Sequence, residues 1–370
     1  QDGDPELAEN FLWALTRGKQ GTKPNLESAL FTDYGAILRY DYGGPNEAYL
    51  NIQQINEWTG IWNGYRLWGS MNYRWNGRGN GILYYAAKNK IWSWNGVEEN
   101  GDAFDINALP LFNVNGAGLG YHKTDGILYN FDEVQFYRAK GSNPGYFSRD
   151  IMMVRDDYVA IYDNVSEGEE GRFQWINPYW DMPATHALED GPGDNLHIVE
   201  PRIKKTYQTK NKSNYTEIEK DREKEFLFVS DRHEVVREKH IFFLGRTGYA
   251  KKNYLAIFEG SKIQFGEFGL EVTGQGFGAS ACIESDGRIH GRIAGNGQGE
   301  IILTLPEEIK TEKINVYING DKIEHVKIGK LISFSCHVSV ADGYYSIYEI
   351  LPLNVTPTPP PLHPILSSSK

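Results

Sequence analysis

The chain has 370 residues and a formal net charge of -11 at pH 7. This length can bury a large core, either in one large all-β domain or in two smaller ones. No run of lysine and arginine forms a basic stripe, so the composition argues against a nucleic-acid partner and disfavours a highly sulfated polyanion. No apolar run reaches the roughly 20 residues of a membrane-spanning helix, and we therefore expect no membrane span.

Residues 1–25 contain one pattern that is typical of a helix. Asp4 can cap this helix, Pro5 suits its first turn, and Gly18 ends it. Its apolar residues recur at helical spacing and share one face, namely Leu7, Phe11, Leu12 and Leu15. Because a strand pattern occupies the rest of the chain, we interpret this segment as the last helix of a larger helical domain that this chain lacks.

From Ser28 onward the chain changes to short runs rich in β-branched and aromatic residues, bounded by Gly, Asn and Asp. The strands expected first along the chain are Gly35–Tyr42, Gly81–Ala87, Lys90–Trp94, Gly126–Phe131, Val134–Ala139, Ile151–Val154 and Tyr158–Asp163. Those expected later are Phe173–Ile176, Glu225–Ser230, His240–Leu244, Tyr254–Phe258, Lys262–Phe265, Gly299–Leu305, Lys313–Ile318, Leu331–Val338 and Tyr344–Ile350. Asn319-Gly320 predicts a tight hairpin turn. The sequence therefore favours an all-β fold, a large antiparallel β-supersandwich over residues 26–352.

Two polar segments interrupt or end this pattern. Residues 204–225 are charged and indicate an exposed loop or a long solvated hairpin, and we expect any seam between two sandwich halves to lie there. Residues 353–370 are rich in proline and then in serine, so we expect a disordered tail or a linker.

The chain's two cysteines, Cys282 and Cys336, provide no disulfide framework. The sequence leaves open whether one bridge joins them. As free thiols they are better explained as small buried hydrophobic residues than as nucleophiles. The histidines show no close pair at metal-ligand spacing, so the sequence predicts no cofactor and leaves a divalent metal ion open.

Aromatic residues gather between Tyr40 and Trp94, and Trp58–Trp94 adds glycines, arginines and asparagines to them. Tyr and Trp rings stack on the apolar faces of sugars, while arginine and amide donors suit a sugar carboxylate and its hydroxyls. The predicted substrate-binding residues are Trp62, Arg66, Trp68, Arg74, Trp75, Asn76 and Asn80. The alternative is a glycine-rich turn with structural arginines and with rings that pack in a core.

Elimination at a uronic acid needs a base for the proton beside the carboxylate, donors that neutralise the carboxylate, and an acid for the leaving oxygen. Tyrosine and histidine commonly transfer such protons, and a neighbouring arginine favours the phenolate of a tyrosine. The candidate catalytic residues are therefore Tyr65, Tyr73, Arg78 and His122, with a packed or surface role as the alternative for each. Hydrolysis by paired carboxylates stays open, through Glu98, Glu99, Asp102 and Asp105.

A set of motifs runs along the expected strands. It begins with Leu30-Phe-Thr-Asp-Tyr-Gly-Ala-Ile-Leu-Arg39 and continues, after the Gly/Asn/Trp-rich turn, with Pro110-Leu-Phe-Asn-Val-Asn-Gly116. Further on come Asp150-Ile-Met-Met-Val-Arg-Asp-Asp-Tyr-Val-Ala-Ile-Tyr-Asp163 and Phe173-Gln-Trp-Ile-Asn-Pro178. Together these motifs resemble the sandwich region of the heparinase II/III-like polysaccharide lyases, over about Leu26 to Leu351.

The resemblance implies an α/α toroid before the sandwich, of which residues 1–25 would be a remnant, and β-elimination on a uronic-acid-containing glycan. In that family the toroid supplies a catalytic tyrosine and an Asn or His, and the sandwich supplies a histidine from a His-rich turn. Here the corresponding segment, Tyr65–Asn80, contains no histidine, and Phe112-Asn113 stands where His-Asn is expected.

The sequence thus leaves three interpretations. The first, which we favour for the intact protein, is the sandwich portion of a polysaccharide lyase. The second, which we favour for the behaviour of this chain in isolation, is a non-catalytic carbohydrate-binding or structural module. The third is a cell-surface scaffold. The first two predict an acidic or neutral polysaccharide as the partner and an extracellular or periplasmic location.

Overall fold

The structure of the chain is a computed structural model. It describes residues 26–31, 35–53, 81–94, 126–140, 146–165, 196–202, 208–212, 214–309, 313–340, 345–353 and 355–359. Over these residues the fold is all-β, with three antiparallel sheets and no helix. The helix expected within residues 1–25 lies outside the described residues.

The first two sheets have five strands each. The first sheet consists of β1 (Ala29–Phe31), β2 (Gly35–Tyr40), β3 (Ala48–Gln53), β4 (Gly81–Ala87) and β5 (Lys90–Trp94), in chain order. The second sheet consists of β6 (Ile127–Asn130), β7 (Val134–Lys140), β8 (Tyr146–Val154), β9 (Tyr158–Val165) and β10 (Leu196–Val199), also in chain order.

The third sheet has 12 strands, and β17 pairs with β16, β21 and β22. Its strands in chain order are β11 (Gln208–Asn211), β12 (Thr216–Lys220), β13 (Glu223–Glu238), β14 (Ile241–Lys251), β15 (Tyr254–Phe265), β16 (Phe268–Ile283), β17 (Ile289–Thr304), β18 (Ile314–Ile318), β19 (Asp321–Ile323), β20 (Val326–Ile328), β21 (Leu331–Val340) and β22 (Ser346–Pro352).

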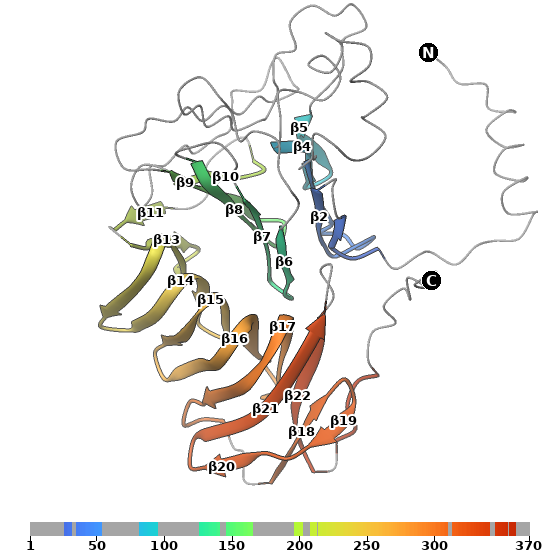
Figure 1. Cartoon of the computed structure of the whole chain (residues 1–370), viewed down its shortest axis with the longest axis vertical. Helices are drawn as coiled ribbons and strands as arrows, with labels where there is room; N and C mark the ends of the chain where they lie inside the picture. Colours follow the sequence, from blue (N-terminus) through green and yellow to red (C-terminus); the bar gives the residue numbers. More distant parts are fainter. Residues whose placement is uncertain are drawn as a thin grey trace, which may run out of the picture.

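The three sheets are stacked, with the second sheet (green) between the first (blue) and the third (yellow to red) in Figure 1. A first core lies between the first and second sheets and includes Leu38, Leu50 and Ile151. A second core lies between the second and third sheets and includes Phe136 and Phe258, whose ring centroids are 4.7 Å apart. The second sheet is therefore buried on both faces.

Double burial explains the apolar runs of β8 and β9. Successive side chains of a strand point to opposite faces, so Ile151 and Met153 enter the first core while Met152 and Val154 enter the second. Each of these four side chains is 0% exposed. A strand with both faces buried has no polar face to alternate with, which is why its sequence reads as a continuous apolar run.

A third core lies on the face of the third sheet that turns away from the second sheet. In β13, Phe226 and Phe228 enter this third core, whereas Leu227 and Val229 enter the second core. The members of the third core come from the third sheet and its connections alone. The sheet covers this face by curving, as Figure 1 shows from β11 to β22.

The expected strands that lie among the described residues are found as strands, and the Asn319-Gly320 turn joins β18 to β19 with positive φ angles of 50° and 85°. Within residues 204–225, β12 pairs with β11 and with the start of β13, in a hairpin arrangement. The sequence did not predict β3, β10, β16, β19, β20 or the first part of β17. No helix of the described residues could span a membrane.

The cysteines form no bridge, because Cys282 and Cys336 are both free. Cys282 belongs to the second core and Cys336 to the third, so their side chains occupy opposite faces of the same sheet. Both thiols are buried, and in the absence of a metal ion burial raises the pKa of Cys282 to about 12 and that of Cys336 to about 11.

A buried arginine connects the second sheet to the third. Arg138 of β7 donates to both carboxylate oxygens of Asp150 at 2.6 Å and to the Thr247 hydroxyl at 3.2 Å, and it also pairs with Glu259. Burial works against the charge of Arg138, but Asp150 and Glu259 outweigh this effect and raise the pKa of the guanidinium. The stack of sheets therefore contains a buried cation whose charge Asp150 and Glu259 compensate.

We expect Arg138→Met to reduce the free energy of unfolding by about 3–5 kcal/mol, because it leaves the buried Asp150 carboxylate without its cation. Urea denaturation measures the change. The matched control is Arg232→Met, since Arg232 is 79% exposed in its pair with Glu234 and its loss should leave the urea midpoint unchanged. Equal effects of the two substitutions would contradict this role for Arg138.

Candidate functional site

The residues predicted from the sequence to bind or transform a substrate lie outside the described residues. This holds for the substrate-binding set of Trp62, Arg66, Trp68, Arg74, Trp75, Asn76 and Asn80. It holds equally for the catalytic set of Tyr65, Tyr73, Arg78 and His122. Both sets stay predictions, and the candidate site that the structure describes is a different one.

A cleft of about 280 Å³ opens where the first, second and third sheets meet. It takes residues from the chain before β1, from the end of β2 and the turn after it, from β6, β7 and the turn between them, and from β17. Its lining is more polar than apolar and consists of Leu26, Glu27, Arg39, Tyr40, Asp41, Tyr42, Asn130, Asp132, Gln135 and Arg292. We call this feature the three-sheet cleft.

The end of β2 forms one wall of the three-sheet cleft. The Arg39 guanidinium lies over the Tyr42 ring, 4.3 Å from its centroid, and 4.9 Å from the centroid of the Tyr49 ring. Asp41 has a positive φ of 49°, and its carboxylate accepts a bond of 2.9 Å from the Asn46 amide. The turn after β2 is thereby fixed, and the Arg39–Tyr42 contact is a cation–π interaction at a partly exposed surface.

The β6–β7 turn and β17 form the opposite wall. Arg292 lies 3.8 Å above the Tyr345 ring, and its Nε is 2.6 Å from Asp132 Oδ1. Its Nη1 donates to the backbone carbonyl of Asn130 at 3.2 Å. These contacts hold the Arg292 guanidinium against the Tyr345 ring, while its nitrogen atoms face Asn130 and Asp132 at the end of β6.

Glu27 connects the chain before β1 to the wall formed by the β6–β7 turn and β17. Its carboxylate accepts a bond of 3.0 Å from the Tyr345 hydroxyl and one of 3.4 Å from the Asn130 side-chain amide. Burial, with Glu27 as a further cause, raises the pKa of Tyr345 even though Arg292 acts in the opposite direction. The hydroxyl therefore stays protonated at neutral pH and can act as a donor to Glu27.

The charges around the three-sheet cleft largely compensate one another. Arg292 pairs with Asp132, and Arg39 lies 3.5 Å from Glu47. Such a cleft offers hydrogen-bond donors and acceptors but little net charge. A polyanion, by contrast, binds where several unpaired cations gather. Its groups suit a ligand rich in hydroxyls, and its tyrosine rings offer apolar faces beside them.

A charged network lies on the other side of the same β6–β7 turn. Arg155 pairs with Glu133 at 2.5 Å, with Asp157 at 2.9 Å and with Glu225 at 2.9 Å, while Lys251 pairs with Glu133 at 2.6 Å. Burial opposes the charge of Glu133, but Arg155 and Lys251 outweigh it and lower the pKa of this carboxyl. The network reaches the cleft, because burial and then Glu133 raise the pKa of Tyr40.

Little in the sequence predicts this cleft. Glu27, Arg39, Asp132 and Arg292 stand in four separate segments, and of these only Arg39 belongs to a motif, at the end of Leu30–Arg39. The usable signal was local: Arg39-Tyr40-Asp41-Tyr42 places tyrosines and charges at the end of an expected strand.

No family model matches the chain, and no curated protein matches it. A solved structure described as "Heparinase III-BT4657 gene product, Methylated Lysines" is similar to it at 10% sequence identity, with a TM-score of 0.28. The match covers 90% of this chain and 46% of that chain, so this chain spans about half the length of that protein. The structural similarity is distant.

The lowered pKa of Glu133 predicts how stability depends on pH. A carboxyl whose pKa is lower in the folded state stabilises the fold fully above its ordinary pKa of 4.5, and this contribution is lost as the pH falls through the lowered value. We therefore expect Glu133→Gln to reduce the acid dependence of the free energy of unfolding below about pH 5, as urea denaturation at a series of pH values would measure.

An acid dependence that is the same in Glu133→Gln and the unmodified chain would show that the Arg155 network does not provide it.

Proposed function

We propose that the chain binds a neutral or weakly acidic polysaccharide and that the three-sheet cleft holds a segment of it. The observation that carries the proposal is the composition of this cleft, in which tyrosine rings stand beside paired charges and fixed amides. Binding a sugar needs apolar faces for its ring and directional partners for its hydroxyls, and this lining supplies both.

The charge pattern supports a neutral or weakly acidic glycan over a sulfated one. The cleft carries the acids Glu27, Asp41 and Asp132 against the bases Arg39 and Arg292, and the chain's net charge is -11. A densely sulfated chain would meet this acidic surface without a matching set of free cations. A single uronate carboxylate carries one negative charge, which one guanidinium can pair with.

Beyond binding, we propose that the protein acts as part of a polysaccharide lyase on a uronic-acid-containing glycan. This rests on the motifs at Leu30–Arg39 and Asp150–Asp163, with the sheets arranged as a β-supersandwich and an α/α toroid supplying further catalytic groups. Tyr65, Tyr73, Arg78 and His122 stay the proposed proton-transfer and carboxylate-binding residues of this chain. An extracellular or periplasmic location follows from the substrate, since such polysaccharides are met outside the cytoplasm.

The binding proposal predicts that Tyr42→Ala weakens the retention of the chain in affinity gels by about tenfold, which corresponds to about 1.4 kcal/mol. The loss follows from removing the ring that Arg39 holds at the edge of the cleft. The gels contain alginate, hyaluronan, xylan or heparin, and we expect retention in at least one of the first three and weaker retention in heparin.

The matched control for that experiment is Tyr317→Ala, because Tyr317 is a partly exposed tyrosine of β18 that does not line the cleft. Equal weakening by both substitutions, or retention in heparin alone, would refute a glycan site in the three-sheet cleft.

The lyase proposal predicts that this chain alone, without a toroid, binds glycan but forms no product. Absorbance of the unsaturated uronate reports elimination while the purified chain is incubated with alginate, hyaluronan, chondroitin or heparan. We expect a flat trace with each. A rising trace that the double variant Tyr73→Phe, Arg78→Ala abolishes would show instead that the chain is a complete lyase.

A further inference from the structure

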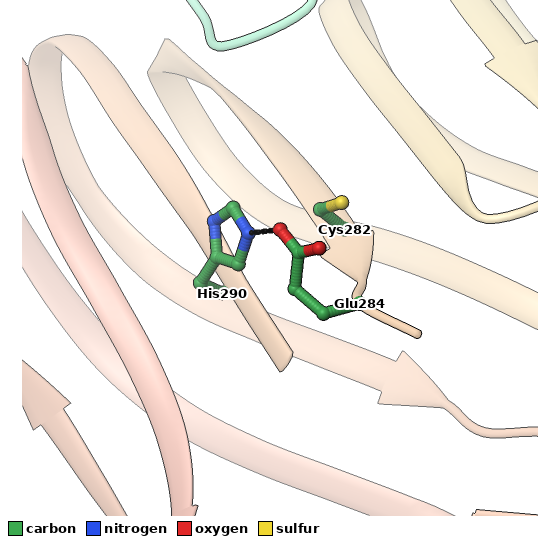
Figure 2. Close-up of side chains that lie close together, drawn as sticks. All are labelled: Cys282, Glu284 and His290. Atoms are coloured by element: carbon green, nitrogen blue, oxygen red, sulfur yellow. Dashed lines mark hydrogen bonds and ion pairs between the residues drawn. The ribbon is translucent and has the colours of Figure 1, made fainter. Parts of the chain in front are cut away.

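We propose that Cys282, Glu284 and His290 bind a divalent transition-metal ion of the zinc type. The three side chains lie together at the end of the β16–β17 hairpin, beside the three-sheet cleft but outside its lining (Figure 2). One possible ligand atom from each, namely a thiol sulfur, a carboxylate oxygen and an imidazole nitrogen, lies within 4.8 Å of the others.

The hairpin itself brings these residues together. Cys282 of β16 and His290 of β17 are direct cross-strand partners, so their side chains stand on the same face of the sheet. Glu284 follows two residues after Cys282, and its amide donates to the Arg288 carbonyl at 2.9 Å. Gly287, with a φ of +83°, allows the chain to reverse there. The backbone register therefore fixes the three positions.

His290 has a carboxylate at each of its ring nitrogens. Its Nε2 is 2.8 Å from Glu284 Oε1, and its Nδ1 is 3.7 Å from Asp132 Oδ2. A metal-binding histidine typically presents one nitrogen to the ion and its other N–H to a carboxylate, which orients the ring. Asp132 is the carboxylate nearest that outer position. Its Oδ2 lies 3.7 Å from His290 Nδ1, which is longer than a hydrogen bond, and its Oδ1 lies 2.6 Å from Arg292 Nε.

The donor set indicates which kind of ion would bind. Calcium and magnesium take oxygen ligands, whereas a set of sulfur, nitrogen and oxygen is typical of zinc and similar transition metals. Ligand atoms bound at about 2.0–2.3 Å around a tetrahedral ion lie roughly 3.5 Å apart. The 4.8 Å limit of this cluster exceeds that spacing by about 1.3 Å, so the side chains have to rotate toward one another to close around an ion.

The surroundings fit an ion that binds from solvent. The Glu284 side chain is 44% exposed, whereas Cys282 is 7% exposed, so the cluster opens on one side and is closed on the other. Three protein ligands with one open side match zinc sites in which a water takes the fourth position. The alternative is a plain His290–Glu284 ion pair, which needs neither Cys282 nor Asp132.

The experiment uses the full chain, without a histidine tag and stripped with a chelator, and titrates it with Co²⁺ and with Zn²⁺. We expect one equivalent of Co²⁺ to give a thiolate-to-cobalt absorption band in the near ultraviolet, and Zn²⁺ to displace it. Cys282→Ser should abolish this band, and His290→Gln and Glu284→Gln should each weaken Zn²⁺ binding at least tenfold. Asp132→Asn should weaken binding by about 10–100-fold, as outer-shell partners do.

The matched controls are Cys336→Ser, which changes the only other cysteine, and His337→Gln, which changes an exposed histidine of β21; both should bind as the unmodified chain does. Because Glu284 is exposed, Glu284→Gln is expected to fold even if Cys282→Ser does not, and circular dichroism checks each variant. The proposal is overturned if Co²⁺ gives no thiolate band, or if Glu284→Gln and His290→Gln bind Zn²⁺ as tightly as the unmodified chain. The result is independent of glycan binding, which the affinity gels measure separately.

Discussion

Burial of the second sheet on both faces is the constraint on which the rest of the structure depends. It requires apolar side chains at Ile151–Val154 of β8 and Tyr158–Tyr162 of β9, and it requires an internal partner for any charge that stays in the sheet. Asp150 and Asp163 are both 0% exposed, and arginines of neighbouring strands, Arg138 and Arg149, pair with them. Such pairs contribute less to stability than their closeness suggests, because desolvation offsets much of the attraction. Their geometry does fix how strands β7, β8 and β9 are aligned.

Because both faces of the second sheet are packed, its β6–β7 turn is held in a defined place between β2 and β17. The turn carries two consecutive acids whose side chains serve different partners. Asp132 contacts Arg292 and His290, whereas Glu133 contacts Arg155 and Lys251. The packing of the sheets thus positions the polar β6–β7 turn, and this turn forms part of one wall of the three-sheet cleft.

The sequence predicted the all-β class and many strands because apolar and aromatic runs bounded by turn residues dominate it. It failed at β16, where Gly274 and Gly276 interrupt the pattern that identifies a strand. Both glycines adopt positive φ angles, beside a register shift between Gln275 and Phe277 in the pairing with β17. A Cβ at Gly276 would lie 2.2 Å from the Asn296 carbonyl oxygen. The two glycines therefore make the strand hard to recognise in the sequence, and they also allow the backbones of β16 and β17 to approach closely.

The candidate site was less predictable than the fold, since its residues meet only through tertiary structure. Cys282 and His290 are eight positions apart in sequence, which is no metal-ligand spacing by itself, and they face each other because a turn of defined register joins their strands. Asp132 reaches His290 only because the second sheet packs on the third. Asp132 also pairs with Arg292 and lines the three-sheet cleft. The same carboxylate therefore lies beside both the cleft and the cluster of Cys282, Glu284 and His290. The position of Arg292 therefore decides how much of the Asp132 charge is compensated beside His290.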